Sequence, residues 1–188
     1  MKKILIINGH EKFPNLAEGK FNRTFSDLAL EHAKNQSMEV QSTYVDEPFD
    51  IEQELQKLVW ADLVILQTPV YWFCVPGKLK MYIDQVFLAG YRTIYTGAGG
   101  KDYGKGGLLK GKYMLSTTWN APEMAFEFGA LMDGRTVDDV FLWLHKTLNY
   151  IGLTKAAPTF SCFDIVKNPN IDDNTKCYQE HLGSYVVG

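Results

Sequence analysis

Two short, unbroken apolar runs place the strongest constraint on how this chain can fold. Lys3 to Asn8 reads KILIIN and Ala61 to Thr68 reads ADLVILQT, and both are far too short to span a membrane. A strand with one wet face would alternate apolar and polar residues, whereas a strand buried on both faces need not. These runs therefore predict strands of a parallel sheet that is covered on both faces.

The rest of the chain alternates further strand patterns with helical ones. We expect one domain over residues 1–188, with a doubly wound, three-layer α/β fold and right-handed crossovers. The expected strands are 3–8, 39–45, 61–68, 112–119 and 157–163, and the expected helices are 20–35, 51–58, 76–88, 137–151 and 173–186. Ligands bind such sheets beyond the carboxyl ends of the strands, so the loops 9–22, 68–76 and 118–129 are the places to look for a site.

Composition excludes several classes of protein. The 188 residues carry a net charge of −3 and no Lys/Arg-rich run, so nucleic acid is not an expected partner. No apolar stretch approaches the length of a membrane span, so membrane insertion is not expected either. The three cysteines are widely spaced and the four histidines are scattered, which argues against a disulfide framework and a metal site. These features predict a cytoplasmic protein.

An aromatic stretch follows the third expected strand. It comprises Val70, Tyr71, Trp72 and Phe73, flanked by Pro69 and Pro76. Aromatic side chains and backbone N–H groups at a strand end suit a flat ligand with polar atoms on its rim, such as a flavin ring. Core packing or an oligomer contact would explain the same composition about equally well.

A second candidate segment follows the fourth expected strand. Thr118, Trp119, Asn120 and Ala121 could flank a planar ligand from its other side. Alone, an ordinary strand exit with an Asx turn at Asn120 explains them better. The functional interpretation gains from the expectation that both segments lie at one edge of the sheet.

The loop after the first strand leads directly into a helix, where a phosphate would meet the helix N-terminus. His10, Lys12 and Lys20 add positive charge or donors, and Asn22 and Thr24 add polar groups in the first turn. The loop is long enough to reach around a pyrophosphate. A solvated loop histidine is an equal alternative for His10.

A glycine-rich segment at 89–111 imitates nucleotide motifs without satisfying them. Gly99 to Lys105 fits GxxxxGK, but Gly106 stands where Ser or Thr would hold magnesium, and no strand–loop–helix context surrounds it. We interpret it as a mobile loop or one ordered by a partner subunit. Cys74 has no apparent base nearby and is interpreted as a packed side chain.

Several longer motifs resemble one family. They are ILIINGHEKF, GKFNRTF, WADLVILQTPVYWFCVPGKLKMYIDQVF, YGKGGLLKGKYMLSTTWNAP and GLTKAAPTF. In these motifs the chain is similar to flavodoxin-like NAD(P)H:quinone oxidoreductases, in particular to the FAD-dependent "modulator of drug activity B" branch. The resemblance implies strand order 2-1-3-4-5, a homodimer, and two-electron hydride transfer from NAD(P)H through the flavin to a quinone by a ping-pong mechanism.

The resemblance also implies which residues hold the FAD. Ala17 to Thr24 would surround its phosphates and ribose, 70–73 would lie along the isoalloxazine and 118–121 at its other edge. Tyr103 would be contributed across the dimer, and His10 would bind phosphate as in the animal enzymes, a weaker inference. The residues implied to bind the cofactor are Ala17, Glu18, Gly19, Lys20, Phe21, Asn22, Arg23, Thr24, Val70, Tyr71, Trp72, Phe73, Tyr103, Thr118, Trp119, Asn120, Ala121 and His10.

The chain departs from the animal enzymes after the fourth strand. Where they carry a Tyr and a His that assist hydride transfer, this chain reads EMAFEFGALMDGR, so no catalytic side chain is predicted. An FMN-dependent azoreductase, a flavodoxin-type electron carrier with FMN, and a regulatory subunit of a potassium efflux system remain alternatives. The sequence leaves open the acceptor and the choice between NADH and NADPH.

Overall fold

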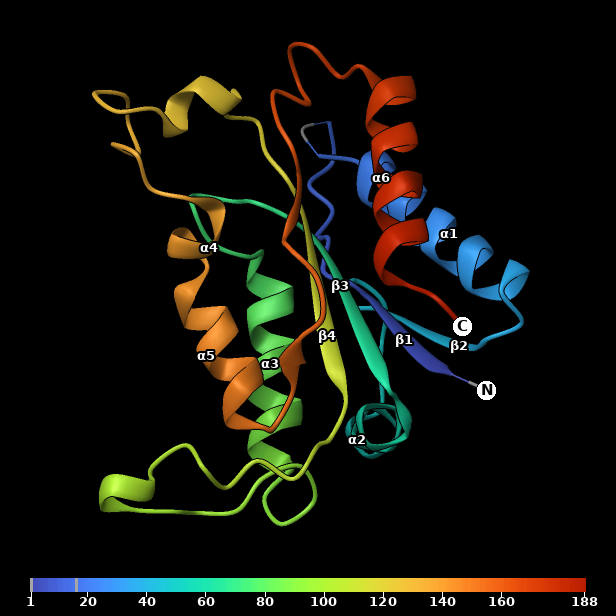
Figure 1. The fold of residues 1–188 in the computed structure, drawn as a ribbon, viewed down its shortest axis with the longest axis vertical. Helices are drawn as coiled ribbons and strands as arrows, with labels where there is room; N and C mark the ends of the chain where they lie inside the picture. The colour runs from blue at the N-terminus through green and yellow to red at the C-terminus, as the bar shows by residue number, and fades with distance from the viewer. Residues whose placement is uncertain (1, 16) are drawn as a thin grey trace.

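A parallel sheet forms the centre of the computed structural model, which describes residues 2–15 and 17–188 (Figure 1). Its strands run in the order β2-β1-β3-β4-β5, with β6 also paired to β4, and every pair is parallel. The predicted order 2-1-3-4-5 is therefore confirmed. The strands are β1 (Lys3–Asn8), β2 (Glu39–Tyr44), β3 (Leu63–Pro69), β4 (Lys112–Thr118), β5 (Thr154–Lys155) and β6 (Phe160–Cys162).

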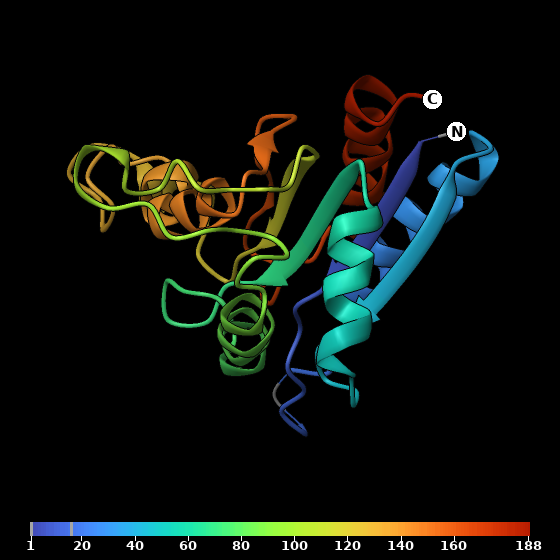
Figure 2. The same cartoon turned by 90° about the horizontal axis from the view of Figure 1, so that it is seen from below.

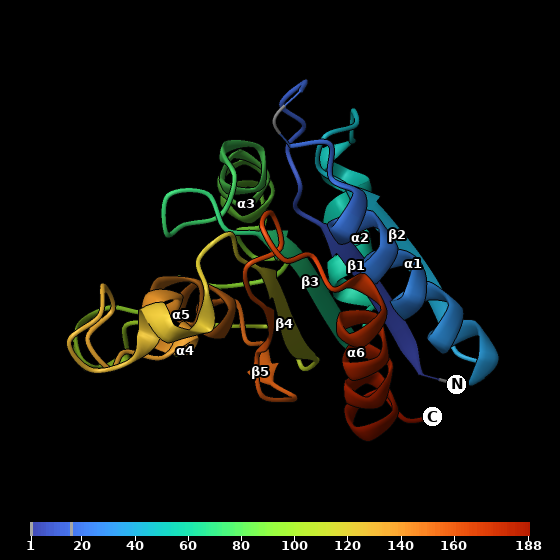
Figure 3. The same ribbon diagram turned by 90° about the horizontal axis from the view of Figure 1, so that it is seen from above.

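Helices cover both faces of this sheet, as the unbroken apolar runs predicted. The helices are α1 (Lys20–Asn35), α2 (Ile51–Trp60), α3 (Gly77–Ala89), α4 (Val137–Val140), α5 (Leu142–Tyr150) and α6 (Ile171–Tyr185), with short 3₁₀ turns at Gly100–Asp102 and Glu123–Phe126. Helices α1 and α6 pack on one face, while α2, α3 and α5 cover the other (Figure 3). Within β1, Ile4 and Ile6 face the first layer and Leu5 and Ile7 the second, which is why the run needs no polar positions.

Two expected elements are interrupted in the structure. Of the last strand, expected over 157–163, only β6 at 160–162 forms, while β5 pairs earlier at 154–155 and Pro158 lies between the two. Proline cannot donate to a ladder, which accounts for the gap. The helix expected over 137–151 is broken at Phe141, which lies fully buried with its ring 5.9 Å from that of Trp119.

Helix starts follow local capping signals. Asp50 accepts a hydrogen bond from the backbone N–H of Gln53 at 2.9 Å and begins α2. Helix α3 begins just after Pro76, which occupies its N-cap. None of the helices in the described parts of the chain is both long and apolar enough to cross a membrane.

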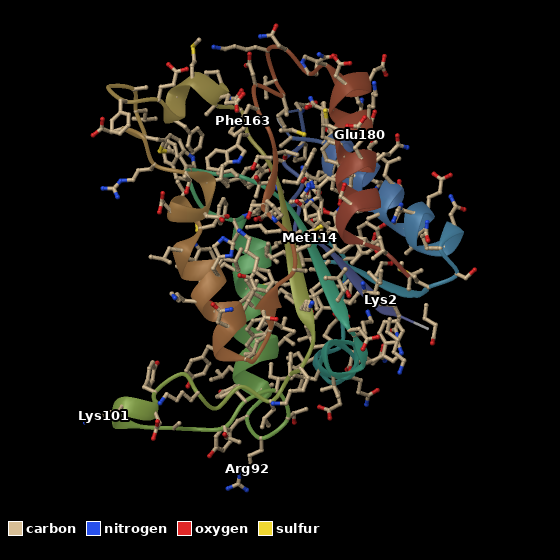
Figure 4. The ribbon with its side chains drawn as sticks, viewed as in Figure 1. Lys2, Arg92, Lys101, Met114, Phe163 and Glu180 are labelled. Carbon is tan, nitrogen blue, oxygen red and sulfur yellow. The ribbon has the colours of Figure 1, made fainter. Side chains whose placement is uncertain are left out.

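The carboxyl ends of β1, β3 and β4 meet at one edge of the sheet. Asn8 pairs with Gln67, and Pro69 pairs with Thr118. The backbone N–H of Gly9 donates to Gln67 at 2.8 Å, and that of Val70 donates to Thr118 at 2.9 Å, so the pairing continues into the loops. Figure 4 shows Phe163 at this end of the molecule, Met114 in mid-sheet, and Arg92 and Lys101 at the opposite end. The three candidate loops therefore leave from the same edge.

Candidate functional site at the carboxyl edge of the sheet

The loop after β1 wraps a histidine at the start of α1. Gly19 occupies the N-cap of that helix with φ of 77°, and a Cβ at this position would lie 2.5 Å from the His10 ring. Only glycine combines this backbone conformation with such a close approach. Among the described residues, no side chain caps the first turn of α1, so its N–H groups remain open to an anion.

His10 lines a cavity of about 260 Å³ at this helix start, called the His10 cavity below. The residue is 9% exposed, and its Nε2 has no hydrogen-bond partner within the described part of the chain. Burial lowers the pKa of the imidazole, and the nearby carboxylate of Asp46 opposes this only in part. The side chain is therefore neutral at pH 7. A hydrogen bond with the Ala17 backbone also opposes the lowering, and an anion in the cavity would favour the protonated imidazole, in which Nε2 becomes a donor.

Charged side chains of both signs line the same cavity. Lys12 pairs with Glu18 at 3.0 Å, and Arg23 lies 3.8 Å from Glu47 and stacks over the ring of Tyr44 at 4.3 Å. Both ion pairs are largely exposed, and pairs of this kind contribute little to stability. The two cations can therefore turn toward a bound anion at small cost.

The aromatic stretch after β3 forms a tight and strained turn. Tyr71 and Cys74 exchange two backbone hydrogen bonds of 2.9 and 3.1 Å. Between them, Trp72 and Phe73 have φ of 51° and 62°, the left-handed region that bulky residues avoid. Trp72 is 94% exposed, so core packing does not explain its place in the turn. Backbone strain and an uncovered indole together indicate a ligand or partner at this turn.

Tyr71 points toward the first loop instead of outward with Trp72. Its hydroxyl donates to the backbone carbonyl of Glu11 at 3.0 Å, and its ring lies 5.6 Å from that of Phe13. The carboxylate of Glu11 in turn accepts the N–H of Lys78 in the first turn of α3 at 3.1 Å. Tyr71 and Glu11 thus brace the first loop, the aromatic turn and α3 against one another.

The segment after β4 divides into a buried and an exposed part. The indole of Trp119 is 1% exposed, donates to Thr117 Oγ1 at 2.9 Å and packs against Phe126 and Phe163. Its backbone N–H and C=O bond to Cys162 and Ile165. Asn120, by contrast, is exposed at the sheet edge. The structure therefore places Asn120, and not the Trp119 ring, where a ligand could touch it.

Asn22 and Thr118 lie beneath the surface and bond to each other. Asn22 is 3% and Thr118 1% exposed, and Asn22 Nδ2 donates to Thr118 Oγ1 at 3.1 Å. Gln67, Asn8 and Glu11 also contact these loops and were not among the expected site residues. The sequence did carry a signal for Asn8 and Gln67, because each is a polar residue that directly follows the apolar residues of a predicted strand.

Tyr103 is separated from the other expected site residues. It lies in the glycine-rich loop, which runs beside α5 (Figure 2), with its ring 5.5 Å from that of Tyr150. There it borders a hollow of about 590 Å³ between α3 and α5, lined by Ile83, Asp84, Phe87, Leu88, Tyr95, Tyr103, Lys146, Thr147, Tyr150 and Ile151. Within one chain, Tyr103 therefore does not join the carboxyl-edge site.

Metal and thiol chemistry find little support at this site. Residues 2–15 and 17–188 contain no group of His, Cys, Asp and Glu side chains that could hold a metal ion. Cys74 is half-buried in the aromatic turn, where its backbone closes the turn on Tyr71.

Comparisons with known proteins agree with this architecture. The profile of a family described as "Flavodoxin-like fold" matches residues 2–186. An uncharacterized protein of Schizosaccharomyces pombe is 43% identical over 188 residues, covering 96% of this chain and 95% of its own. The NADPH:quinone oxidoreductase MdaB of Haemophilus influenzae is 38% identical over 187 residues, covering 95% and 96%.

Among solved structures, a quinone reductase described as putative from Klebsiella pneumoniae superposes with a TM-score of 0.80. Its sequence identity is 21%, and the match covers 98% of this chain and 85% of that one. At this identity the likeness concerns the fold alone.

Proposed function

We propose that this chain, which belongs to the flavodoxin-like fold family, is an FAD-dependent NAD(P)H:quinone oxidoreductase of the cytoplasm. The reaction class rests on the relative from H. influenzae, whose name gives that activity and which matches nearly end to end. The observation that carries the proposal is the His10 cavity: a buried imidazole nitrogen without a partner among the described residues, beside an uncapped helix start.

These groups fit the phosphates of a flavin nucleotide. The N–H groups at the start of α1 and His10 Nε2 would donate to phosphate oxygens, with Lys12 and Arg23 supplying charge. Gly19, which lies against His10, allows the backbone to come close. Of the expected residues 17–24, Glu18, Gly19 and Arg23 line this cavity, whereas Asn22 supports it from beneath.

We propose FAD over FMN because the cavity extends well past the helix start. It continues to Tyr44 at the end of β2 and to Asp46 and Glu47 in the loop that follows. A single terminal phosphate would not need that reach, whereas a pyrophosphate and its second nucleoside would.

The aromatic turn and Asn120 would hold the ring end of the cofactor. The backbone N–H groups of Trp72 and Phe73 are fixed by the strained turn, and Tyr71 orients that turn through Glu11. A bound flavin would supply the two-electron chemistry between NAD(P)H and a quinone, namely hydride uptake from the first and delivery of hydride with a proton to the second. The chain's contribution would be to orient the ring and cover one face, because the segment after β4 carries neither the Tyr nor the His of the animal enzymes.

A homodimer is part of the proposal. The apolar hollow between α3 and α5 is bordered by Leu88, which is 77% exposed, and by Tyr103, which is 74% exposed. A second copy seated there would cover both side chains and would bring the partner's glycine-rich loop toward the site. Light scattering of purified protein should give about twice the chain mass of 21.4 kDa, and Leu88→Glu should reduce it to one chain.

The proposal is tested by an absorbance spectrum of the purified protein, followed by chromatography of the released cofactor. FAD, together with steady NADPH oxidation that depends on an added quinone, is the expected result. FMN would transfer the chain to the azoreductases or the electron carriers and would remove residues 17–20 from the site. Absence of any flavin, even after reconstitution, would overturn the assignment.

A further inference from the structure

We propose that Gln67 is a positioning residue for the cofactor site, acting through Asn22 on the first turn of α1. The inference rests on the proposed function, because it concerns how the chain prepares that site for a flavin phosphate. Gln67 is completely buried at the end of β3 and belongs to none of the loops that would touch the ligand.

The contacts form a chain from the sheet to the helix. Gln67 Nε2 donates to Asn22 Oδ1 at 2.9 Å, and Asn22 Nδ2 donates to Thr118 Oγ1 at 3.1 Å. Asn8 Nδ2 donates to the backbone carbonyl of Asn22 at 3.1 Å and to Ser26 Oγ at 2.9 Å. We call Asn8, Asn22, Ser26, Gln67 and Thr118 the strand-end cluster. It ties the start of α1 to the ends of β1, β3 and β4.

The position of the cluster along the strands argues for a purpose beyond packing. On the same face, the first buried residues of these strands are apolar: Ile4 and Ile6 in β1, Leu63 and Ile65 in β3, and Met114 in β4. Buried amide and hydroxyl side chains begin only toward the carboxyl ends, with Asn8, Gln67, Ser116 and Thr118. Apolar contacts there would let α1 slide or rotate, whereas directed hydrogen bonds fix one orientation.

This orientation decides where the donors of the site point. Asn22 lies three residues after Gly19, so fixing its side chain also fixes the N–H groups of the first turn and the backbone against His10. A small tilt of α1 would misdirect several donors at once. Loss of the Gln67 amide should therefore weaken flavin binding although Gln67 does not touch the flavin.

The test compares flavin dissociation constants of apoprotein variants, measured by fluorescence titration. Gln67→Met keeps the side-chain length and removes the donor to Asn22, and should raise the constant roughly tenfold. Ser116→Ala is the matched control: Ser116 pairs with Gln67 in register and is equally buried, but its Oγ has no hydrogen-bond partner in the described structure and so makes no link to α1. Its dissociation constant should equal that of the unmodified chain.

A second readout separates positioning from general stability. In an Asn22→Leu background, Gln67→Met should change the dissociation constant no further, because the route through Asn22 is already lost. If Gln67→Met misfolds, Thr118→Val tests the same linkage from the neighbouring strand and should weaken binding by a similar factor. Amide NMR shifts of residues 19–23 should move in the apoprotein of either variant.

The outcomes are distinguishable. If Gln67→Met, or Thr118→Val where the former misfolds, lowers the melting temperature yet binds flavin as tightly as the unmodified chain, Gln67 is merely structural and the inference is wrong. The inference would also be wrong if Gln67→Met weakened flavin binding in the Asn22→Leu background by the same factor as in the unmodified chain. If the unmodified chain binds neither FAD nor FMN, the proposed function fails first and this inference falls with it.

Discussion

Two buried polar clusters in this fold differ in how completely their hydrogen bonds are satisfied. The first joins Thr43, Glu54, Lys57 and Tyr82 beneath α2 and is called the Glu54 cluster. There, one carboxylate oxygen accepts from Thr43 at 2.7 Å and from Tyr82 at 2.9 Å, while the other accepts from Lys57 at 2.6 Å.

The strand-end cluster and the neighbouring His10 lack this completeness. Gln67 Oε1 and His10 Nε2 are buried and have no partner among the described residues. A saturated cluster has nothing left to offer a ligand, whereas unpaired buried groups are costly unless something else completes them. Because His10 Nε2 also lines a cavity at an uncapped helix start, the comparison assigns the Glu54 cluster to stability and the His10 side of the sheet to binding.

Removing Glu54 should give the largest effect on stability. Glu54→Ala leaves the buried Tyr82 hydroxyl and the Lys57 ammonium without their shared acceptor, and should lower the free energy of unfolding by about 3–5 kcal/mol. Urea denaturation measures the change. Glu52→Ala, in the same turn but exposed, should stay within about 1 kcal/mol. Flavin affinity of the folded fraction should not change, and a large loss of it would contradict the division between the clusters.

Replacing His10 should give the opposite profile. His10→Phe fills the same space but cannot donate to a phosphate, so flavin binding should weaken by about 1.5–3 kcal/mol, the usual size of a hydrogen bond to a charged group. Stability of the apoprotein should stay level or rise, since a buried partnerless nitrogen is removed.

His181 supplies the matched control for that substitution. Its Nε2 also lacks a partner among the described residues, and its ring packs on Phe160 and Tyr185, away from the His10 cavity. His181→Phe should leave the flavin titration unchanged. Equal affinities for the His10→Phe and His181→Phe proteins would remove His10 from the site.

Stability should also depend on pH through the histidines. Burial lowers the pKa of His10, His145 and His181 below the usual 6.5. Between the lowered pKa values and about pH 6.5, the unfolded chain therefore binds more protons than the folded chain. Stability is full above about pH 6.5 and falls as the pH drops through the lowered pKa values. Asp138, whose pKa is also lowered, adds to the loss only at lower pH.

Urea midpoints at pH 7.5 and 5.5 measure this dependence. The apoprotein should be less stable at pH 5.5, and the difference between its two urea midpoints should be smaller in the His10→Phe variant. Bound flavin should narrow it as well, because an anionic phosphate favours protonated His10. A midpoint that rises on acidification would show that these histidines are not held neutral by burial.

The parallel sheet covered on both faces could be predicted from the sequence because it depends on local patterns, whereas the strand order 2-1-3-4-5 was implied by the resemblance to a known family. The run Lys3 to Asn8 lacks polar alternation, and that requires helices on both faces. The carboxyl edge then follows from topology alone. Pro158 was visible within the last expected strand, yet its effect on the ladder was overlooked.

Side-chain directions at the edge depend on tertiary contacts, and the sequence could not supply them. Trp72 and Trp119 both follow strands within aromatic segments, yet one is 94% and the other 1% exposed. What separates them is Phe126 and Phe163, which come from later segments and enclose Trp119. The role proposed for Gln67 likewise depends on a contact that only the fold creates, since its hydrogen-bond partner Asn22 comes from α1.

The smallest expected change in stability comes from the strained turn. Trp72→Gly removes the strain of a non-glycine residue in the left-handed region, which costs about 1–2 kcal/mol, but it also raises the conformational entropy of the unfolded chain. The two effects on the free energy of unfolding should cancel to within about 1 kcal/mol. Trp72→Ala keeps the Cβ and the strain, and should be the less stable of the two variants by about 1 kcal/mol. Since the indole is 94% exposed, neither variant loses core packing. Both should bind flavin more weakly than the unmodified chain, whereas full occupancy with normal turnover in both would mean that the turn stores its strain for some purpose other than the flavin.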